Sequence, residues 1–334
     1  DAPRFVFSVP SINRGEPYKR YQWTTLPQGM KNSPVLCQTF VVQVLSPIRR
    51  LFPEAIILHY MDDILICAAS TNYLQAALDR TMKAIKNAGF QIAEDKIQLS
   101  SPWKYLGFLI TGRTVAPQSL VIKDDPWTLR DLQQLCSTIT WIRPLLGLTT
   151  EQLSPLFHLL KGDGDLASPR HLTPDAREAL ERVAAAIKSR QAHRVAQSLP
   201  VKCAILGKSP NLHALLFQDP LLVIEWLFLP HRPAKTVTTF PELMSKLIIK
   251  ARQRLRTFAG SDPACIYLLL NLDQLDFLLQ TNENLQISVD SYPGQILIHY
   301  PKHKLFKDTL YLAPKIFKSK TPLKGTLTVF TDGS

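Results

Sequence analysis

The feature that most constrains the fold is a pair of adjacent carboxylates between two short apolar runs. Residues 60–63, Tyr-Met-Asp-Asp, separate the β-prone segments 55–59 and 64–68. Two such runs joined by a short polar segment predict a β-hairpin with Asp62 and Asp63 at its tip. Strands of this composition normally bury both faces, so the turn would present clustered negative charge on a rigid support.

Carboxylate oxygens are the ligands that hard divalent cations prefer. Mg²⁺ is held by one or two carboxylates plus substrate phosphates, and two such ions can clamp the attacking and leaving oxygens of a phosphoryl displacement. The alternative is a solvated Asp-Asp turn, because Asp is a favoured turn residue. The hairpin alone does not choose between a metal site and a solvated turn.

Composition indicates a folded chain of two or more domains with a basic surface. The chain has 334 residues, of which 46% are hydrophobic, and its net charge of +12 suits a polyanionic partner without proving one. Its five cysteines are widely spaced without a CxxC pair, so a reduced, intracellular setting is the default. The apolar stretch 221–229 is too short to span a bilayer, and we expect no membrane partner.

Residues 1–112 alternate short apolar strands with helices. The patterns predict a strand over 4–10, a helix over 34–50 and a helix over 74–88 that ends at Gly89. Together with the hairpin, this order predicts an α+β domain with a mainly antiparallel sheet.

The pattern becomes helical from residue 125 to 197. An apolar stripe at helical spacing and the N-cap pair Thr173-Pro174, which opens a helix through Ala192, predict a small bundle. Beyond residue 198, a separate α/β domain is predicted in which a long basic helix over 241–258 accompanies several strands. These strands are expected at 201–206, 214–218, 223–229 and 265–270.

Two aromatic segments flank the Asp pair. Residues 21–23, Tyr-Gln-Trp, lead into 26–30, Leu-Pro-Gln-Gly-Met, where the Gln28 amide could bond a sugar or base edge and Gly29 allows close backbone approach. Residues 103–108, Trp-Lys-Tyr-Leu-Gly-Phe, predict an aromatic hairpin. An ordinary turn and plain core packing are the respective alternatives.

Six motifs in a fixed order identify a family. They are Phe-Val-Phe-Ser-Val-Pro-Ser-Ile-Asn at 5–13, Leu-Pro-Gln-Gly-Met-Lys-Asn-Ser-Pro at 26–34, Tyr-Met-Asp-Asp at 60–63, Tyr-Leu-Gly at 105–107, Trp-Ile-Arg-Pro at 141–144 and Leu-Thr-Val-Phe-Thr-Asp-Gly-Ser at 327–334. In these motifs the chain resembles the retroviral reverse transcriptases over essentially its whole length. The resemblance is closest to the Pol polyprotein of class K, betaretrovirus-like endogenous retroviruses.

The resemblance implies a multidomain α+β fold of the right-hand polymerase type. Its expected parts are a palm with part of the fingers over 1–112, a helical thumb over 113–197, an RNase H-like α/β connection domain over 198–322 and the start of an RNase H domain over 323–334. The implied activity is RNA-directed DNA synthesis, a two-metal nucleotidyl transfer onto a primer 3′-hydroxyl, with a linked RNase H.

The implied cofactor is a pair of Mg²⁺ ions, with Mn²⁺ as an alternative. The implied partners are an RNA template, a DNA primer, the RNA–DNA hybrid, dNTPs and a second subunit in a homodimer or heterodimer. The implied location is intracellular, in the cytoplasm or in a virus-like particle where the chain is expressed.

The resemblance also implies a role for single residues. Asp62 and Asp63 match the catalytic metal-binding pair, and Asp332 matches the first metal-binding Asp of RNase H. The residues expected near the incoming nucleotide are Gln28, Tyr60 and Met61. The residues expected at the template or primer are Pro34, Tyr105, Leu106, Gly107, Gln133 and Trp141.

A face of the predicted thumb helix fits a duplex groove. Gln133, Ser137 and Trp141 are spaced by four, so they share one face over about 12 Å. Ser137 stands where the family commonly has glycine, and Trp141 as a plain core residue is the alternative. On the basic helix of the connection domain, the candidate phosphate contacts are Lys246, Lys250, Arg252, Arg254 and Arg256, although solvated helix charge explains any single one.

The family's third metal-binding carboxylate lies on a strand upstream of the match to this chain. Asp1 falls in a connecting loop and does not take that role. We therefore expect the chain alone to extend a primer poorly or not at all, because two ions cannot be properly clamped. The alternative function is a non-catalytic template-primer-binding or dimer-partner module, a degenerate relic. A reading frame that continues upstream into an Asp-bearing strand would favour the polymerase.

Overall fold

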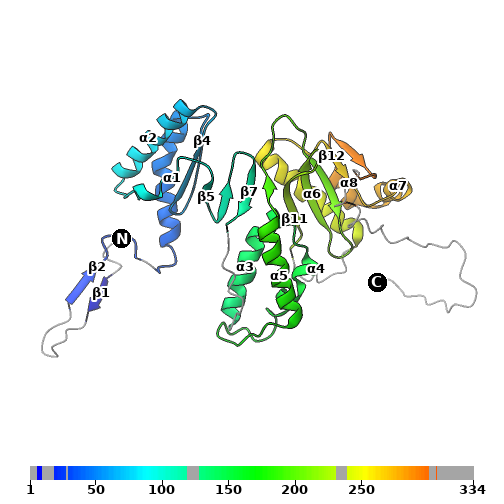
Figure 1. Cartoon of the computed structure of the whole chain (residues 1–334), viewed down its shortest axis with the longest axis horizontal. Coiled ribbons are helices and arrows are strands. Elements are labelled where there is room, and N and C mark those ends of the chain that lie inside the picture. Colours follow the sequence, from blue (N-terminus) through cyan, green and yellow to red (C-terminus); the bar gives the residue numbers. More distant parts are fainter. Residues whose placement is uncertain are drawn as a thin grey trace, which may run out of the picture. The chain divides into compact units, whose positions relative to one another are not determined.

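The computed structural model of the chain describes residues 6–9, 19–27, 29–118, 128–230, 239–300 and 306. The chain divides into two compact units, residues 1–106 and 107–334, which Figure 1 traces in sequence colours. Helices and strands mix in both units, as the predicted α+β class requires. Two predicted site residues, Gln28 and Asp332, lie outside the described residues.

The first unit combines three helical segments with short antiparallel pairs. Strand β1 pairs with β2, and β3 pairs with β4. Its elements are β1 (Val6–Val9), β2 (Lys19–Gln22), α1 (Ser33–Leu51), β3 (Ile56–Tyr60), β4 (Asp63–Cys67), α2 (Thr71–Asn87), the 3₁₀ segment η2 (Glu94–Lys96) and β5 (Trp103–Tyr105).

Local signals explain where the helices of the first unit begin and end. Helix α1 starts with a proline in its first turn, as predicted, and carries Arg49 and Arg50 in its last turn, where they complement the helix dipole. Helix α2 begins at Thr71, three residues before the predicted start, because the Ser70 hydroxyl caps it by accepting from the Tyr73 amide. The predicted stop at Gly89 is confirmed by its left-handed φ of +87°.

The core of the first unit is small. Its buried residues are Val41 and Leu45 of α1, Ile57 of β3 and Ile85 of α2. On the other face of β3, Ile56 and Leu58 are 58% and 49% exposed. The expectation that the hairpin buries both faces is therefore wrong, because among the described residues the helices cover only one face of it.

The second unit holds a helical bundle and a larger sheet. Its elements are β6 (Phe108–Ile110), β7 (Thr114–Pro117), α3 (Leu129–Leu146), α4 (Thr150–His158), α5 (Pro174–Ser189), β8 (Ala192–His193), β9 (Lys202–Leu206), β10 (His213–Gln218), β11 (Leu222–Phe228), α6 (Phe240–Ala259), β12 (Cys265–Tyr267), α7 (Leu272–Thr281), α8 (Glu283–Val289) and β13 (Gln295–Leu297). None of the helices in the described part is long and apolar enough to cross a membrane.

The bundle of α3, α4 and α5 follows the predicted pattern. The predicted apolar stripe of α3 is buried, and its members are Leu132, Leu135, Cys136, Ile139 and Ile142. The Thr173 hydroxyl caps α5 as expected. The predicted continuation to Ala192 is wrong, because Ala192 and His193 pair with β7 as strand β8.

The sheet has the order β11-β10-β9-β12-β13. Strands β9, β10 and β11 are antiparallel neighbours, whereas β12 is parallel to β9 and β13. Apolar residues of α6 share a core with β9 and β10, and a second cluster that includes Phe217 and Tyr267 contains the alternate residues of the same strands. The predicted strands are present, although β12 ends at Tyr267 rather than at Leu270.

The end of α3 is packed against β11. Gly147 follows α3 with a left-handed φ of +64°, and a Cβ at this position would lie 2.5 Å from the Trp226 ring. The guanidinium of Arg143 lies 3.6 Å from the centre of the Phe228 ring and donates to the Leu148 carbonyl. The bundle and the sheet are thereby joined by close side-chain contacts.

Candidate metal and nucleic-acid sites

The Asp pair lies at the tip of the β3–β4 hairpin, as predicted. Tyr60 pairs with Asp63, so Met61 and Asp62 form a two-residue loop. Met61 has a φ of +50°, a backbone conformation that favours glycine and that costs a residue with a side chain about 1 to 3 kcal/mol. All four residues are exposed, so both carboxylates can reach a ligand from solvent.

Helix α1 is hydrogen-bonded to this hairpin at two places. Near the tip, the Gln38 side-chain oxygen accepts a hydrogen bond from the Met61 amide at 2.9 Å. Further along, Arg49 Nε donates to the Ile57 carbonyl at 3.0 Å, and its Nη2 lies 3.0 Å from His59 Nδ1. The loop that carries the carboxylates is therefore tied to a nineteen-residue helix.

The predicted primer-contact residues lie at the end of strand β5, whose last residue is Tyr105. Burial raises the pKa of the Tyr105 phenol, and the negative charge of Asp63 raises it further, so the two side chains act on each other. Leu106 and Gly107 both have positive φ, of 48° and 81°, and form a tight turn. Tyr105 is thus neutral at physiological pH and its hydroxyl can donate a hydrogen bond.

The start of α1 includes the predicted template residue. Pro34 is exposed in the first turn of α1, and the neighbouring Ser33 hydroxyl donates to the Pro27 carbonyl at 2.7 Å. This bond ties the segment before Gly29, whose φ is +81°, to the helix start. The sequence-predicted pocket wall and template segment are therefore in contact within the first unit.

The two carboxylates at the hairpin would provide part of the oxygen ligands that Mg²⁺ needs. Two exposed carboxylates with substrate phosphates and waters are a usual Mg²⁺ environment. Within the described ranges, no group of three or more His, Cys, Asp or Glu side chains is arranged to hold a metal ion. Asp62 and Asp63 would therefore supply two ligands to a bound ion, and other groups would have to supply the rest.

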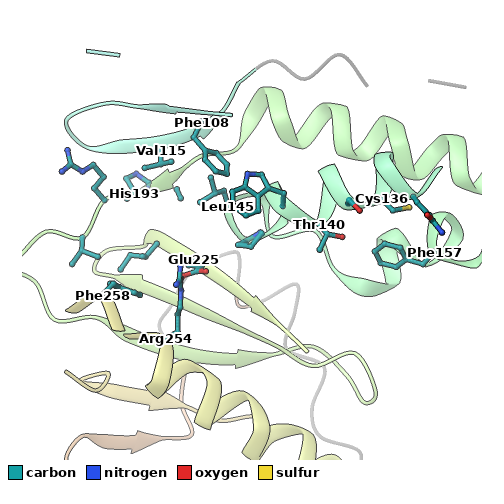
Figure 2. A pocket seen from close by; sticks show the side chains of 18 of the residues that line it. Phe108, Val115, Cys136, Thr140, Leu145, Phe157, His193, Glu225, Arg254 and Phe258 are labelled. Atoms are coloured by element: carbon teal, nitrogen blue, oxygen red, sulfur yellow. Dashed lines mark hydrogen bonds and ion pairs between the residues drawn. The ribbon is translucent and has the colours of Figure 1, made fainter. Parts of the chain in front are cut away.

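The predicted duplex-binding face of α3 opens onto a groove of about 1190 Å³ in the second unit (Figure 2). Gln133, Ser137 and Trp141 all line it. Trp141 is 58% exposed and stacks on Phe108 with a ring-centre distance of 6.0 Å. The alternative in which Trp141 is a plain core residue is therefore wrong.

The opposite wall of the groove was not anticipated from the sequence. It includes His193 of β8, Glu225 of β11 and two residues of α6, Arg254 and Phe258 (Figure 2). Arg254 Nε donates to Glu225 Oε2 at 2.7 Å. These residues are scattered over more than 60 positions, and only tertiary packing brings them together. The sequence singled out Arg254 as a candidate phosphate contact, but no local motif could have shown that it lines a groove with the other three.

Most of the candidate phosphate contacts on α6 are engaged within the protein. Lys250 donates to the Phe228 carbonyl, and Arg254 is paired with Glu225. Arg252 and Arg256 both pair with Asp262, and Arg252 is only 7% exposed. Helical charge alone could not distinguish these internal partners from phosphates. Lys246 is exposed, and no such internal bond links it to another of the described residues.

Comparison with known protein families agrees with the motifs. Residues 1–110 match the family described as reverse transcriptase (RNA-dependent DNA polymerase), residues 117–181 match the reverse transcriptase thumb domain, and residues 209–306 match the ERVK-8-like, RNaseH-like domain. The last match overlaps the sheet and the helices α6 to α8.

Similar proteins include three retroviral polyproteins. The chain is 40% identical to the Gag-Pro-Pol polyprotein of squirrel monkey retrovirus, 40% identical to that of mouse mammary tumor virus (strain BR6) and 39% identical to that of Mason-Pfizer monkey virus. Each alignment covers 100% of this chain but only 18% or 19% of the polyprotein. The chain thus spans less than a fifth of the length of these relatives, and it belongs to the retroviral reverse transcriptase family.

Proposed function

We propose that this chain carries the catalytic Asp pair, the thumb and the RNase H-like connection domain of an RNA-directed DNA polymerase. In the proposed reaction the primer 3′-hydroxyl attacks the α-phosphate of a dNTP, a new phosphodiester bond forms and pyrophosphate leaves. The observation that carries this proposal is the exposed Asp62-Asp63 pair on a hairpin that is fixed to α1.

The chain's own residues would orient the reacting groups. Asp62 and Asp63 would hold Mg²⁺, or Mn²⁺ in its place, and the bound ions would neutralise charge on the phosphates. Tyr60, Met61 and Gln28 would contact the nucleotide. Correct orientation of the primer 3′-hydroxyl lowers the activation barrier by several kcal/mol. We assign this orienting role to Tyr105, Leu106 and Gly107.

The remaining predicted residues would hold the template and the duplex. Pro34 would support the template strand at the start of α1. Gln133 can donate to acceptors in a minor groove, and the exposed face of Trp141 can pack against a sugar or a base. Asp332 would belong to the linked RNase H site. We place the protein in the cytoplasm or in a virus-like particle, where such a template is encountered.

Binding of an RNA–DNA hybrid tests this assignment. We expect Gln133→Ala and Trp141→Ala to weaken binding, measured by fluorescence anisotropy of a labelled hybrid, and we expect affinity to fall steeply as salt rises. Matched controls are Gln134→Ala, an exposed neighbour that does not line the groove, and Phe277→Ala, an exposed aromatic residue of α7. Equal losses in test and control variants would contradict the assignment.

The second candidate function is a non-catalytic module that binds template-primer or a partner subunit. It is favoured by the two-carboxylate donor set at the hairpin, since a two-metal site needs further ligands. We expect the purified chain to extend a primer weakly with Mg²⁺. Robust extension that Asp63→Asn abolishes would select the polymerase, whereas hybrid binding without any extension would select the module.

A further inference from the structure

We propose that Gln38 is a positioning residue for the Asp pair: its side-chain oxygen fixes the loop that aims the carboxylates of Asp62 and Asp63 at the metal. The proposal rests on the proposed function, because it concerns the same site. Gln38 itself would touch neither metal nor substrate. It would act through the backbone amide of Met61, to which it is bonded at 2.9 Å.

The loop needs such a support because of its backbone. Met61 takes a positive φ of 50° directly before Asp62, in a two-residue loop where glycine would be relaxed. A side chain at this position favours other loop conformations, in which the amide and the following carboxylates would point elsewhere. The hydrogen bond from the Met61 amide to Gln38 is made in the observed conformation and therefore favours it.

Gln38 is well placed to provide the bond. Val41 and Leu45, three and seven positions further along α1, are buried in the core with Ile57 of β3, so Gln38 extends the face by which α1 packs on the hairpin. At the other end of this contact, Arg49 bonds to Ile57 and His59. The hairpin is consequently held at its middle and at its tip by one rigid helix.

The chemistry of the glutamine also suits the position. An amide oxygen accepts the bond without adding charge, whereas a glutamate would place a third negative charge next to Asp62 and Asp63. Gln38→Glu therefore keeps the acceptor and changes the charge, and Gln38→Leu removes the acceptor at similar size. The two variants separate loop support from electrostatics.

Amide hydrogen exchange measured by NMR tests the loop directly. We expect exchange at the Met61 amide to accelerate about tenfold in Gln38→Leu, and to stay near the wild-type rate in Gln38→Glu, whose carboxylate can still accept the bond. The matched control is Gln43→Leu, an exposed glutamine of the same helix. If Gln38→Leu changes amide exchange along the whole of α1, the substitution has disturbed the helix itself. Gln38→Asn, whose side chain is shorter by one methylene, then serves as the test variant.

Mn²⁺ affinity, measured by electron paramagnetic resonance, links the loop to the metal. We expect Gln38→Leu to weaken Mn²⁺ binding several-fold and Asp62→Asn to weaken it further. If Asp62→Asn and Asp63→Asn leave Mn²⁺ binding unchanged, the proposed function itself fails. If they weaken it while Gln38→Leu leaves either the Met61 exchange rate or the Mn²⁺ affinity at the wild-type value, the role of Gln38 is overturned.

Discussion

The two units differ in how completely they bury their own apolar side chains. The first unit has one core cluster of four buried residues, and large apolar side chains such as Val35, Leu51 and Ile56 are more than half exposed. The second unit has three buried clusters on the bundle and on both faces of its sheet. The proposed metal-binding pair, Asp62 and Asp63, thus lies in the unit that buries less of its own apolar surface.

This difference separates two roles that one chain combines. Exposed apolar side chains mark a binding surface where they form one contiguous patch. The second unit instead has internal partners for several of its charged residues, as the pairs of Arg252 and Arg254 illustrate. We therefore expect stability to be determined mainly in the second unit and metal chemistry in the first.

The largest effect is expected where two arginines share one buried carboxylate. Burial would raise the pKa of Asp262, but hydrogen bonds from Arg256 and Arg252 lower it overall. Asp262→Asn would leave Arg252 buried without its counter-ion and should lower the free energy of unfolding of the second unit by about 3 to 5 kcal/mol. Urea denaturation measures this free energy of unfolding. Asp276→Asn, on the exposed face of α7, is the control, and similar losses would refute the pairing.

A pair of glycines tests the contact between the bundle and the sheet. Gly147 and Gly260 both end helices with left-handed φ, of 64° and 68°, but only a Cβ at Gly147 would meet the Trp226 ring. Gly260→Ala should cost about 1 kcal/mol for backbone strain, and Gly147→Ala about 2 to 4 kcal/mol because overpacking adds to that strain. Thermal unfolding compares them, and equal costs would mean that α3 does not pack on Trp226 in solution.

Neighbouring residues of β3 test the one-sided packing of the first unit. Ile57 is 4% exposed and Ile56 is 58% exposed. Ile57→Ala should lower the free energy of unfolding by about 2 kcal/mol, and Ile56→Ala by less than about 0.5 kcal/mol. Denaturation followed by a probe in the first unit measures both. A large loss for Ile56→Ala would show that its face is covered in the folded protein.

The smallest effect is a pH dependence confined to the second unit. Burial lowers the pKa of His213, and the nearby charge of Arg143 lowers it further, against opposing effects of the Asn211 carbonyl and Glu151. The unfolded state then binds the proton more readily, so stability is complete above about pH 6.5 and falls at lower pH, by at most about 1.4 kcal/mol per pH unit. His213→Gln should flatten this slope, and exposed His171→Gln should not.

Local patterns predicted the elements well and their tertiary neighbours poorly. The hairpin, the Thr173 cap and the stripe of α3 follow from periodicity and capping chemistry that act within a few residues. The end of α5 was missed because strand pairing with β7 overrides the helical pattern. Among the partners of the α6 arginines, Glu225 lies 29 residues before Arg254, so no local spacing encodes that pair. Asp262 lies only 10 and 6 residues after Arg252 and Arg256, but it follows the end of the helix, so the helical charge pattern did not indicate it.

The candidate site shows the same division. Asp62, Asp63 and Trp141 could be selected from motifs, and the structure places them on exposed surfaces. Gln38 could not be selected, because its partner amide is 23 residues away and belongs to the backbone of Met61. The opposite wall of the α3 groove was missed for the same reason.

Iron-directed cleavage of the chain tests the central claim that the Asp pair binds the metal. Fe²⁺ bound in a Mg²⁺ site generates hydroxyl radicals with ascorbate and peroxide, and these cut the nearby backbone. In the presence of template-primer and a dNTP, we predict cleavage around residues 60–63 that Mg²⁺ suppresses and that Asp62→Asn and Asp63→Asn abolish, whereas Asp79→Asn on α2 preserves it. Cleavage elsewhere, or cleavage at the hairpin that survives in both Asp variants, would contradict the account.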